Sequence, residues 1–82
     1  MLNSPEISEQ YDHYSMFIQW DPEDFIYVVT VPELPGCMTH GKTYEEAIRQ
    51  GKDAIESWID ANKYWGRPIP KPRVWTRIEE AV

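Results

Sequence analysis

The fold is decided by one stretch, Thr43–Ile59, which reads TYEEAIRQGKDAIESWI. It opens like a capping box, in which the Thr43 oxygen accepts from the Glu46 N–H while the Glu46 side chain reaches back. The apolar side chains that follow recur at steps of three and four residues, as on one face of a helix. They are Tyr44, Ala47, Ile48, Gly51, Ala54, Ile55, Trp58 and Ile59. The pattern predicts one amphipathic helix that begins at Thr43 and ends near Asn62–Gly66, where Gly66 can cap it.

The apolar stripe of this helix should form the core with one face of a sheet. We expect the helical side chains Ile48, Ile55, Trp58 and Ile59 to pack there. Two sets of partners remain open, because alternate strand residues point to opposite faces. The first set is Ile26 and Val28, and the second is Phe25, Tyr27 and Val29. A glycine inside a helix costs about 1 kcal/mol relative to alanine, so Gly51 on the stripe predicts a close approach of helix and sheet.

The sheet is predicted from the residues on either side of the helix. Tyr14–Trp20 alternates as a strand, Asp21–Asp24 has turn chemistry, and Phe25–Val31 is β-branched and aromatic. The prolines and glycine of Pro32–Gly36 cannot remain in a ladder, so the chain should bend before a short strand at Cys37–His40. Val74–Ile78 is expected to add a last strand. The fold class is therefore α+β, a small antiparallel sheet with one packed helix in the order β-β-β-α-β.

A chain of 82 residues has room for a single domain. Residues 1–13 are interpreted as a loose N-terminal arm, 14–72 as the domain, and 73–82 as a C-terminal tail. The hydrophobic content of 41% is enough for a folded rather than a disordered chain. A core of this size contributes only about 3–5 kcal/mol of net stability, so we expect a homo-oligomer, a dimer or a tetramer.

Charge is distributed unevenly along the chain. Residues 1–62 carry twelve acidic and three basic side chains, a net −9, whereas residues 63–82 carry five basic and two acidic ones, a net +3. The acidic body should repel a phosphate backbone and attract a basic partner, and the basic end could do the opposite. Solubility alone is the alternative explanation of the acidic excess.

No catalytic, metal or cofactor site is predicted. The acids crowd one turn and the exposed face of the helix, so they do not converge as Mg²⁺ ligands do. Cys37 and His40 stand three apart on a strand and should point to opposite faces, so Cys37 is interpreted as a small core residue. A lone cysteine and the absence of a signal segment favour the cytoplasm, and the longest apolar stretch, Phe25–Val31, is too short to span a membrane.

Three motifs give the chain a family resemblance. They are Val31-Pro32-Glu33-Leu34-Pro35-Gly36-Cys37, then Thr39-His40-Gly41-Lys42-Thr43-Tyr44-Glu45-Glu46-Ala47, then Gly66-Arg67-Pro68-Ile69-Pro70-Lys71-Pro72, with Trp58-Ile59 at the helix end. Together they resemble the HicB-like antitoxins. Lys42 departs from the pattern, since the family often has an acid there. Coverage runs from about Tyr14 to Pro72.

The resemblance implies a fold like a partial RNase H domain and a protein-binding function. Members of the family inhibit a HicA-like toxin, a small basic protein that cleaves mRNA, by covering its RNA-binding face and its catalytic histidine. No catalytic residue carries over to this chain. Many members append a DNA-binding domain, but only ten residues follow Pro72 here, so direct binding of nucleic acid is not expected.

The predicted partner-binding residues fall in two groups. Asp21, Glu23, Asp24 and Glu33 are expected to steer a basic partner, and Trp65 and Trp75 to anchor it, because tryptophan dominates interface energetics. Two alternatives stay open. One is a degenerate RNase H-like nuclease, and the other is a nucleic-acid-binding regulatory module that uses the basic, aromatic end of the chain.

Overall fold

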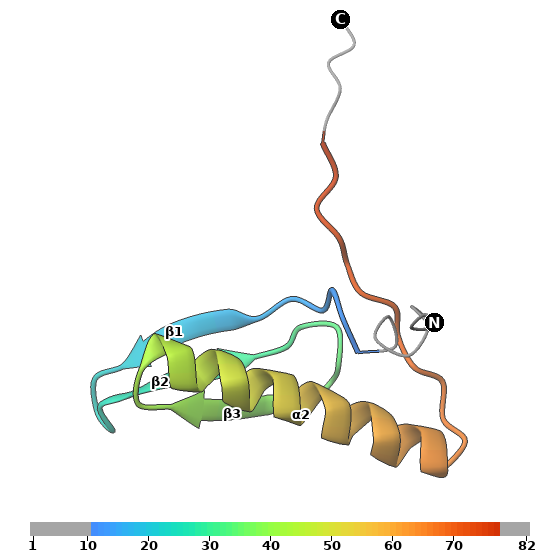
Figure 1. Ribbon diagram of the computed structural model, residues 1–82, viewed down its shortest axis with the longest axis horizontal. Helices are drawn as coiled ribbons and strands as arrows, with labels where there is room; N and C mark the ends of the chain where they lie inside the picture. Colours follow the sequence, from blue (N-terminus) through green and yellow to red (C-terminus); the bar gives the residue numbers. More distant parts are fainter. Residues whose placement is uncertain (1–10, 78–82) are drawn as a thin grey trace, which may run out of the picture.

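A three-stranded antiparallel sheet with one long helix across it forms the fold (Figure 1). The computed structural model describes residues 11–77. Within them the elements are β1 (Phe17–Asp21), β2 (Ile26–Thr30), β3 (Met38–Gly41) and the helix α2 (Tyr44–Tyr64). The strands follow the order β1-β2-β3, and each pairs with its neighbour along the chain. The predicted α+β class is confirmed, whereas the likeness to RNase H remains a prediction.

The first hairpin closes through an aspartate at the end of β1. One Asp21 carboxylate oxygen accepts from the backbone N–H of Glu23 at 2.9 Å, and the Asp21 carbonyl accepts from the Phe25 N–H at 2.8 Å. Phe25 has a φ of 57°, in the left-handed region, so it completes the turn rather than starting β2. β2 therefore begins one residue later than predicted.

The start of β1 also differs from the prediction, at Phe17 instead of Tyr14. The Ser15 N–H donates to the carboxylate of Glu33 and not to a neighbouring strand. The Glu33 side chain, which belongs to the bend after β2, therefore accepts the hydrogen bond that a neighbouring strand would otherwise accept from Ser15. The bend itself, Pro32–Gly36, is closed by the Val31 N–H, which donates to the Cys37 carbonyl at 3.0 Å.

Helix α2 begins and ends as the sequence predicts. Thr43 is the N-cap, and its hydroxyl accepts from the Glu46 N–H at 3.0 Å. The Glu46 carboxylate reaches back to the N–H of Lys42 at 2.6 Å. At the other end Gly66 has a φ of 70°, and its N–H donates to the Lys63 carbonyl at 3.0 Å.

Small residues let the helix approach the sheet closely. A Cβ built on Gly51 would lie 3.3 Å from a Val29 methyl group and 2.7 Å from the Met16 sulfur, which confirms the predicted contact. A Cβ on Gly41 would lie 2.5 Å from the backbone nitrogen of Ala47, so glycine is required where β3 passes the first turn of the helix. The register places Val29 on the covered face, and this resolves the two alternatives in favour of the Tyr27 and Val29 face.

The prediction that Ile48 belongs to the core is wrong. Its side chain is 42% exposed, whereas Ala47 is fully buried. The buried stripe of α2 consists of Ala47, Gly51, Ile55 and Ile59, at steps of four residues. Ile48 is turned by about 100° from Ala47 around the helix axis and points away. Phe25 is also outside the core, at 70% exposure.

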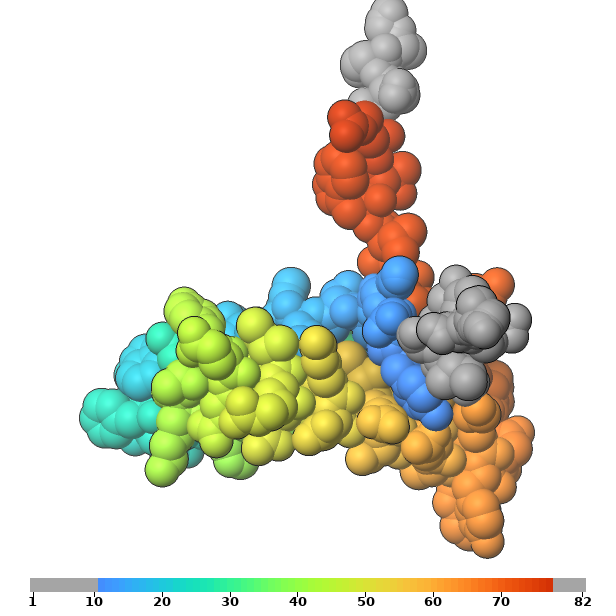
Figure 2. All heavy atoms as spheres, in the orientation of Figure 1, coloured from blue at the N-terminus to red at the C-terminus, as the bar shows by residue number. Residues whose placement is uncertain are grey.

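The predicted last strand, Val74–Ile78, is not formed in the part that the structure describes. Residues 74–77 pair with no strand, and Ile78 lies outside the described residues. Pro68, Pro70 and Pro72 lack an N–H donor, and the Arg73 N–H is taken by Glu33. The described part of the C-terminal tail, residues 73–77, projects from the body (Figures 1 and 2).

Replacing Ile55 by alanine tests this core. Ile55 is 2% exposed on the buried stripe, so Ile55→Ala should lower the free energy of unfolding by about 2–5 kcal/mol. The matched control is Ile48→Ala, which removes the same atoms from an exposed position and should cost well under half as much. Urea unfolding followed by circular dichroism measures both. Equal losses in the two variants would contradict the assigned helix face.

Candidate functional site

The predicted steering acids of the first hairpin lie together in one turn, Asp21–Asp24, named here the acidic turn. Glu23 and Asp24 are exposed, whereas Asp21 is half-buried and accepts backbone hydrogen bonds within the turn. Glu23 and Asp24 can therefore face a partner without loss of structure. Asp21 also stabilises the turn through the backbone hydrogen bonds that it accepts.

Glu33 lies elsewhere and is only 3% exposed. Its carboxylate accepts from the Ser15 N–H at 3.0 Å, from the Ser15 hydroxyl at 2.9 Å and from the Arg73 N–H at 2.8 Å. It thus joins the entry to β1, the bend after β2 and the start of the C-terminal tail. This arrangement connects three chain segments, and no local sequence pattern indicates that they meet.

These hydrogen bonds determine the ionisation of Glu33. Burial acts to raise the pKa of the carboxyl, but the hydrogen bonds from Arg73 and Ser15 outweigh it and hold the pKa below its ordinary value of 4.5. The carboxylate is therefore charged at neutral pH. Because the folded pKa is lowered, Glu33 stabilises the fold above the ordinary pKa, and this contribution is lost as the pH falls through the folded value.

The two predicted anchors lie far from the acidic turn. Trp65 is the C-cap residue of α2, 67% exposed, and its ring meets that of Tyr64 edge-on at 5.2 Å. Trp75 in the C-terminal tail is 78% exposed, with the Arg77 guanidinium 5.5 Å from the ring centroid. In Figure 1 the turn between β1 and β2 and the end of α2 lie at opposite ends of the body. The structure does not bring the steering and anchoring groups together.

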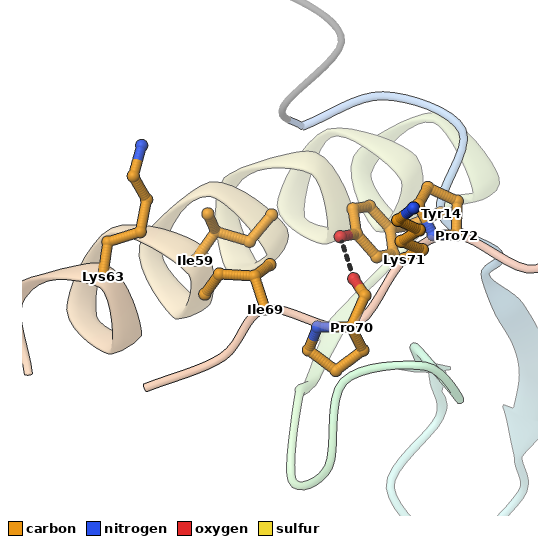
Figure 3. Close-up of a pocket in the computed structure, with 7 residues that line it drawn as sticks. All are labelled: Tyr14, Ile59, Lys63, Ile69, Pro70, Lys71 and Pro72. Atoms are coloured by element: carbon orange, nitrogen blue, oxygen red, sulfur yellow. Dashed lines mark hydrogen bonds between the residues drawn. The ribbon is translucent and has the colours of Figure 1, made fainter. Parts of the chain in front are cut away.

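A cavity of about 300 Å³ lies where the proline-rich segment crosses the end of α2 (Figure 3). Its walls are Tyr14, Ile59, Lys63, Ile69, Pro70, Lys71 and Pro72. The Tyr14 hydroxyl donates to the Pro70 carbonyl, and burial followed by the charge of Glu33 raises the pKa of this phenol. The sequence could not reveal this cavity, because its walls come from distant segments that share no motif.

A second cavity, of about 610 Å³, lies beside the acidic turn and the start of α2. Its walls are Asp24, Ile26, His40, Gly41, Lys42, Glu46 and Gln50, which mix both signs of charge. Within residues 11–77, no three His, Cys, Asp or Glu side chains gather as metal ligands do. Cys37 is buried, and burial raises the pKa of its thiol.

In the described part of the chain, no helix has the length and apolar character needed to cross a bilayer.

The role of Glu33 is tested by an isosteric change. Glu33→Gln places an amide N–H₂ against the Ser15 and Arg73 donors, so it should lower the free energy of unfolding at neutral pH by about 1–3 kcal/mol. The difference from the wild type should shrink as the pH falls below 4.5, where the wild type loses the same interaction. Glu23→Gln, at an exposed position, is the control and should change little. Denaturation across this pH range measures all three proteins, and a constant difference at every pH would contradict the assignment.

Comparison with known proteins adds the family. The sequence profile described as the HicB-like antitoxin of bacterial toxin-antitoxin systems matches residues 14–81. A UPF0150 protein of Thermoplasma acidophilum is 47% identical over 58 residues, which cover 71% of this chain and 83% of the relative. A UPF0150 protein of Archaeoglobus fulgidus is 42% identical over 50 residues, covering 61% of this chain and 71% of that protein.

A third relative comes from a virus. It is a 14.9 kDa protein of Haemophilus phage HP1, 40% identical over 45 residues that cover 55% of this chain and 34% of the phage protein. The profile match extends over most of the chain, including the bend at Glu33 and the whole of α2. The chain therefore belongs to the HicB-like antitoxin family.

Proposed function

We propose that this chain neutralises a small basic HicA-like toxin, which cleaves mRNA, by covering the toxin's RNA-binding and active surface. Family membership supports an antitoxin role, and the observation that carries the choice of a basic partner is the exposed acidic surface of the body. The exposed acids are Asp12, Glu23, Asp24, Glu45, Asp53, Glu56 and Asp60. The positively charged side chains of a toxin surface that binds RNA would be attracted to these carboxylates.

The proposed mechanism separates encounter from retention. Glu23 and Asp24 steer the basic protein, with Asp21 holding their turn, and an aromatic anchor then slows dissociation. Trp65 and Trp75 are candidate anchors because they are exposed and have no duty in the core. Glu33 has a supporting part: its carboxylate fixes the start of the tail that carries Trp75. The chain acts in the cytoplasm as a binding protein and not as an enzyme.

Self-association is part of the proposal. The face of the sheet opposite α2 carries Phe17, Thr30 and Met38 as neighbours across three strands. Phe17 is 61% and Met38 is 59% exposed, and a second copy would cover both. A dimer is the minimum form that we propose.

Sedimentation tests the dimer. The wild type should sediment as a dimer or a tetramer at micromolar concentrations, and Phe17→Asp should shift it to the monomer because a charge would be buried in the interface. The helical circular dichroism of the variant should stay unchanged. A wild type that is monomeric throughout would contradict self-association.

Co-expression with a small basic HicA-like protein, taken from a gene adjacent to the one that encodes this chain, tests the antitoxin activity. The toxin alone should stop growth and degrade mRNA, and this chain should restore both and co-purify with it. If the adjacent protein is harmless alone, or its toxicity is untouched, the proposal fails. Mg²⁺-dependent RNA cleavage by the purified chain would favour the nuclease alternative, and salt-sensitive retention of RNA would favour the nucleic-acid-binding alternative.

A matched pair of charge reversals tests the steering. Glu23→Lys with Asp24→Lys should slow association with the toxin and flatten its salt dependence, while dissociation changes less. Asp53→Lys with Glu56→Lys alters the net charge equally on the exposed side of α2 and serves as control. Stopped-flow binding at several salt concentrations measures both. Equal slowing in the two variants would show that net charge, and not the acidic turn, steers the encounter.

A further inference from the structure

Four aromatic rings form a continuous row beside the acidic turn. The Phe25 and Trp20 rings meet edge-on at 6.3 Å, Trp20 and Tyr27 at 5.0 Å, and Tyr27 stacks on Tyr44 at 4.4 Å. Trp20 and Tyr27 are opposite each other in the ladder of β1 and β2, and Tyr44 is the first residue of α2. This aromatic row, Phe25, Trp20, Tyr27 and Tyr44, crosses the end of the body where the β1–β2 turn and the start of α2 lie (Figure 1).

The aromatic row is separate from the core. Phe25 is 70%, Tyr44 is 58% and Trp20 is 49% exposed. The buried core cluster consists of other residues, namely Val31, Leu34, Cys37, Ile55 and Ile59. Contiguous exposed aromatic surface of this kind marks interaction sites more often than it serves stability. The rings support one another, but their outer faces remain open to solvent.

The backbone at Phe25 points to a use for its ring. Its φ of 57° is unfavourable for a bulky residue, and glycine or asparagine would adopt this conformation at a lower cost in free energy. The residue gains little burial in return, because most of its side chain is exposed. Backbone strain at a largely exposed residue is typical of positions kept for binding. At Phe25 the strain holds a ring at the outer end of the row.

Charge around the row selects the chemistry of its partner. Glu23 and Asp24 directly precede Phe25, and Glu45 follows Tyr44, all exposed. Lys42 is the cation nearest in sequence to this end of α2. Aromatic faces carry negative quadrupole potential, and carboxylates beside them add to it, so the surface attracts guanidinium groups and repels phosphates. The same chain already pairs Arg77 with the Trp75 ring at 5.5 Å.

We propose that the aromatic row is a docking surface for an arginine-bearing surface of a partner protein. Guanidinium groups stack on the exposed rings of Phe25 and Trp20 and form ion pairs with Glu23 and Asp24. The inference deepens the proposed function, on which it rests for the identification of that partner as the toxin. It places the anchor next to the steering acids, whereas Trp65 and Trp75 lie at the other end of the body.

The first test uses a short synthetic peptide of alternating Arg and Gly at physiological ionic strength. Titration of the ¹⁵N-labelled chain should shift the indole N–H signal of Trp20, with smaller changes at Trp65 and Trp75. A peptide with Lys in place of Arg should bind more weakly, because only the planar guanidinium stacks on rings. Shifts confined to Trp65 and Trp75, or an equal response of Trp20 to an oligothymidylate, would overturn the proposal.

The decisive variant is Phe25→Gly. Glycine accepts a positive φ, so the variant should unfold at the same or a higher denaturant concentration, yet it should bind the Arg-Gly peptide about 2- to 30-fold more weakly. Tyr64→Ala is the matched control, because Tyr64 also carries an exposed aromatic ring, 81%, but it is the last residue of α2, at the end of the helix opposite Tyr44. Its affinity for the peptide should equal that of the wild type. Equal affinity in Phe25→Gly and the wild type would overturn the docking surface.

The peptide titration and the toxin assay fail independently. The titration contains no toxin. If the chain does not bind the peptide, the proposed docking surface is rejected, but the proposal of toxin neutralisation is still tested by co-expression. If co-expression fails, the toxin is not the partner, but a Trp20 response that Phe25→Gly weakens would still establish the docking surface.

Discussion

The close contact of α2 with β2, at Gly51 against Val29, is the constraint on which the rest of the structure depends. A Cβ at Gly51 would lie 2.7 Å from the Met16 sulfur and 3.3 Å from the Val29 side chain, so both side chains would have to shift to make room for it. The contact covers one face of the sheet and leaves Phe17 and Met38 exposed on the other. It also helps to position the start of α2, where the ring of Tyr44 stacks on that of Tyr27. One close contact thus determines the core, the open face and the position of the aromatic row.

A second constraint is electrostatic and lies at the other end of the body. The buried Glu33 carboxylate takes the N–H groups of Ser15 and Arg73, which would otherwise need strand partners. It therefore delays the start of β1 to Phe17 and directs the tail away from the sheet. A buried charge is tolerated only when it is well hydrogen-bonded, and Glu33 meets this condition. The acidic turn lies outside this junction and is free to meet a partner.

Much of the fold could be predicted from local patterns. The capping box at Thr43, the glycine at position 66 and the apolar period determine α2, and the turn chemistry of Asp21–Asp24 determines the hairpin. Ile48 was wrongly predicted to lie in the core, because the period of the apolar residues does not show which side of a wide apolar stripe faces the sheet. The prediction of a strand at Val74–Ile78 was wrong because the Arg73 N–H donates to Glu33, an acceptor that lies forty residues away in sequence. The aromatic row could not be predicted, since it depends on the register of β1 with β2 and on the left-handed backbone of Phe25.

The central claim is that the end of the body with the acidic turn and the aromatic row receives a basic protein partner. Amide hydrogen exchange of the chain, free and bound to the proposed basic partner, tests this most directly. We expect slower exchange on binding in residues 20–28 and 43–46, and a larger change there than in residues 65–77, which hold the candidate anchors Trp65 and Trp75. Protection confined to residues 65–77 would contradict the claim.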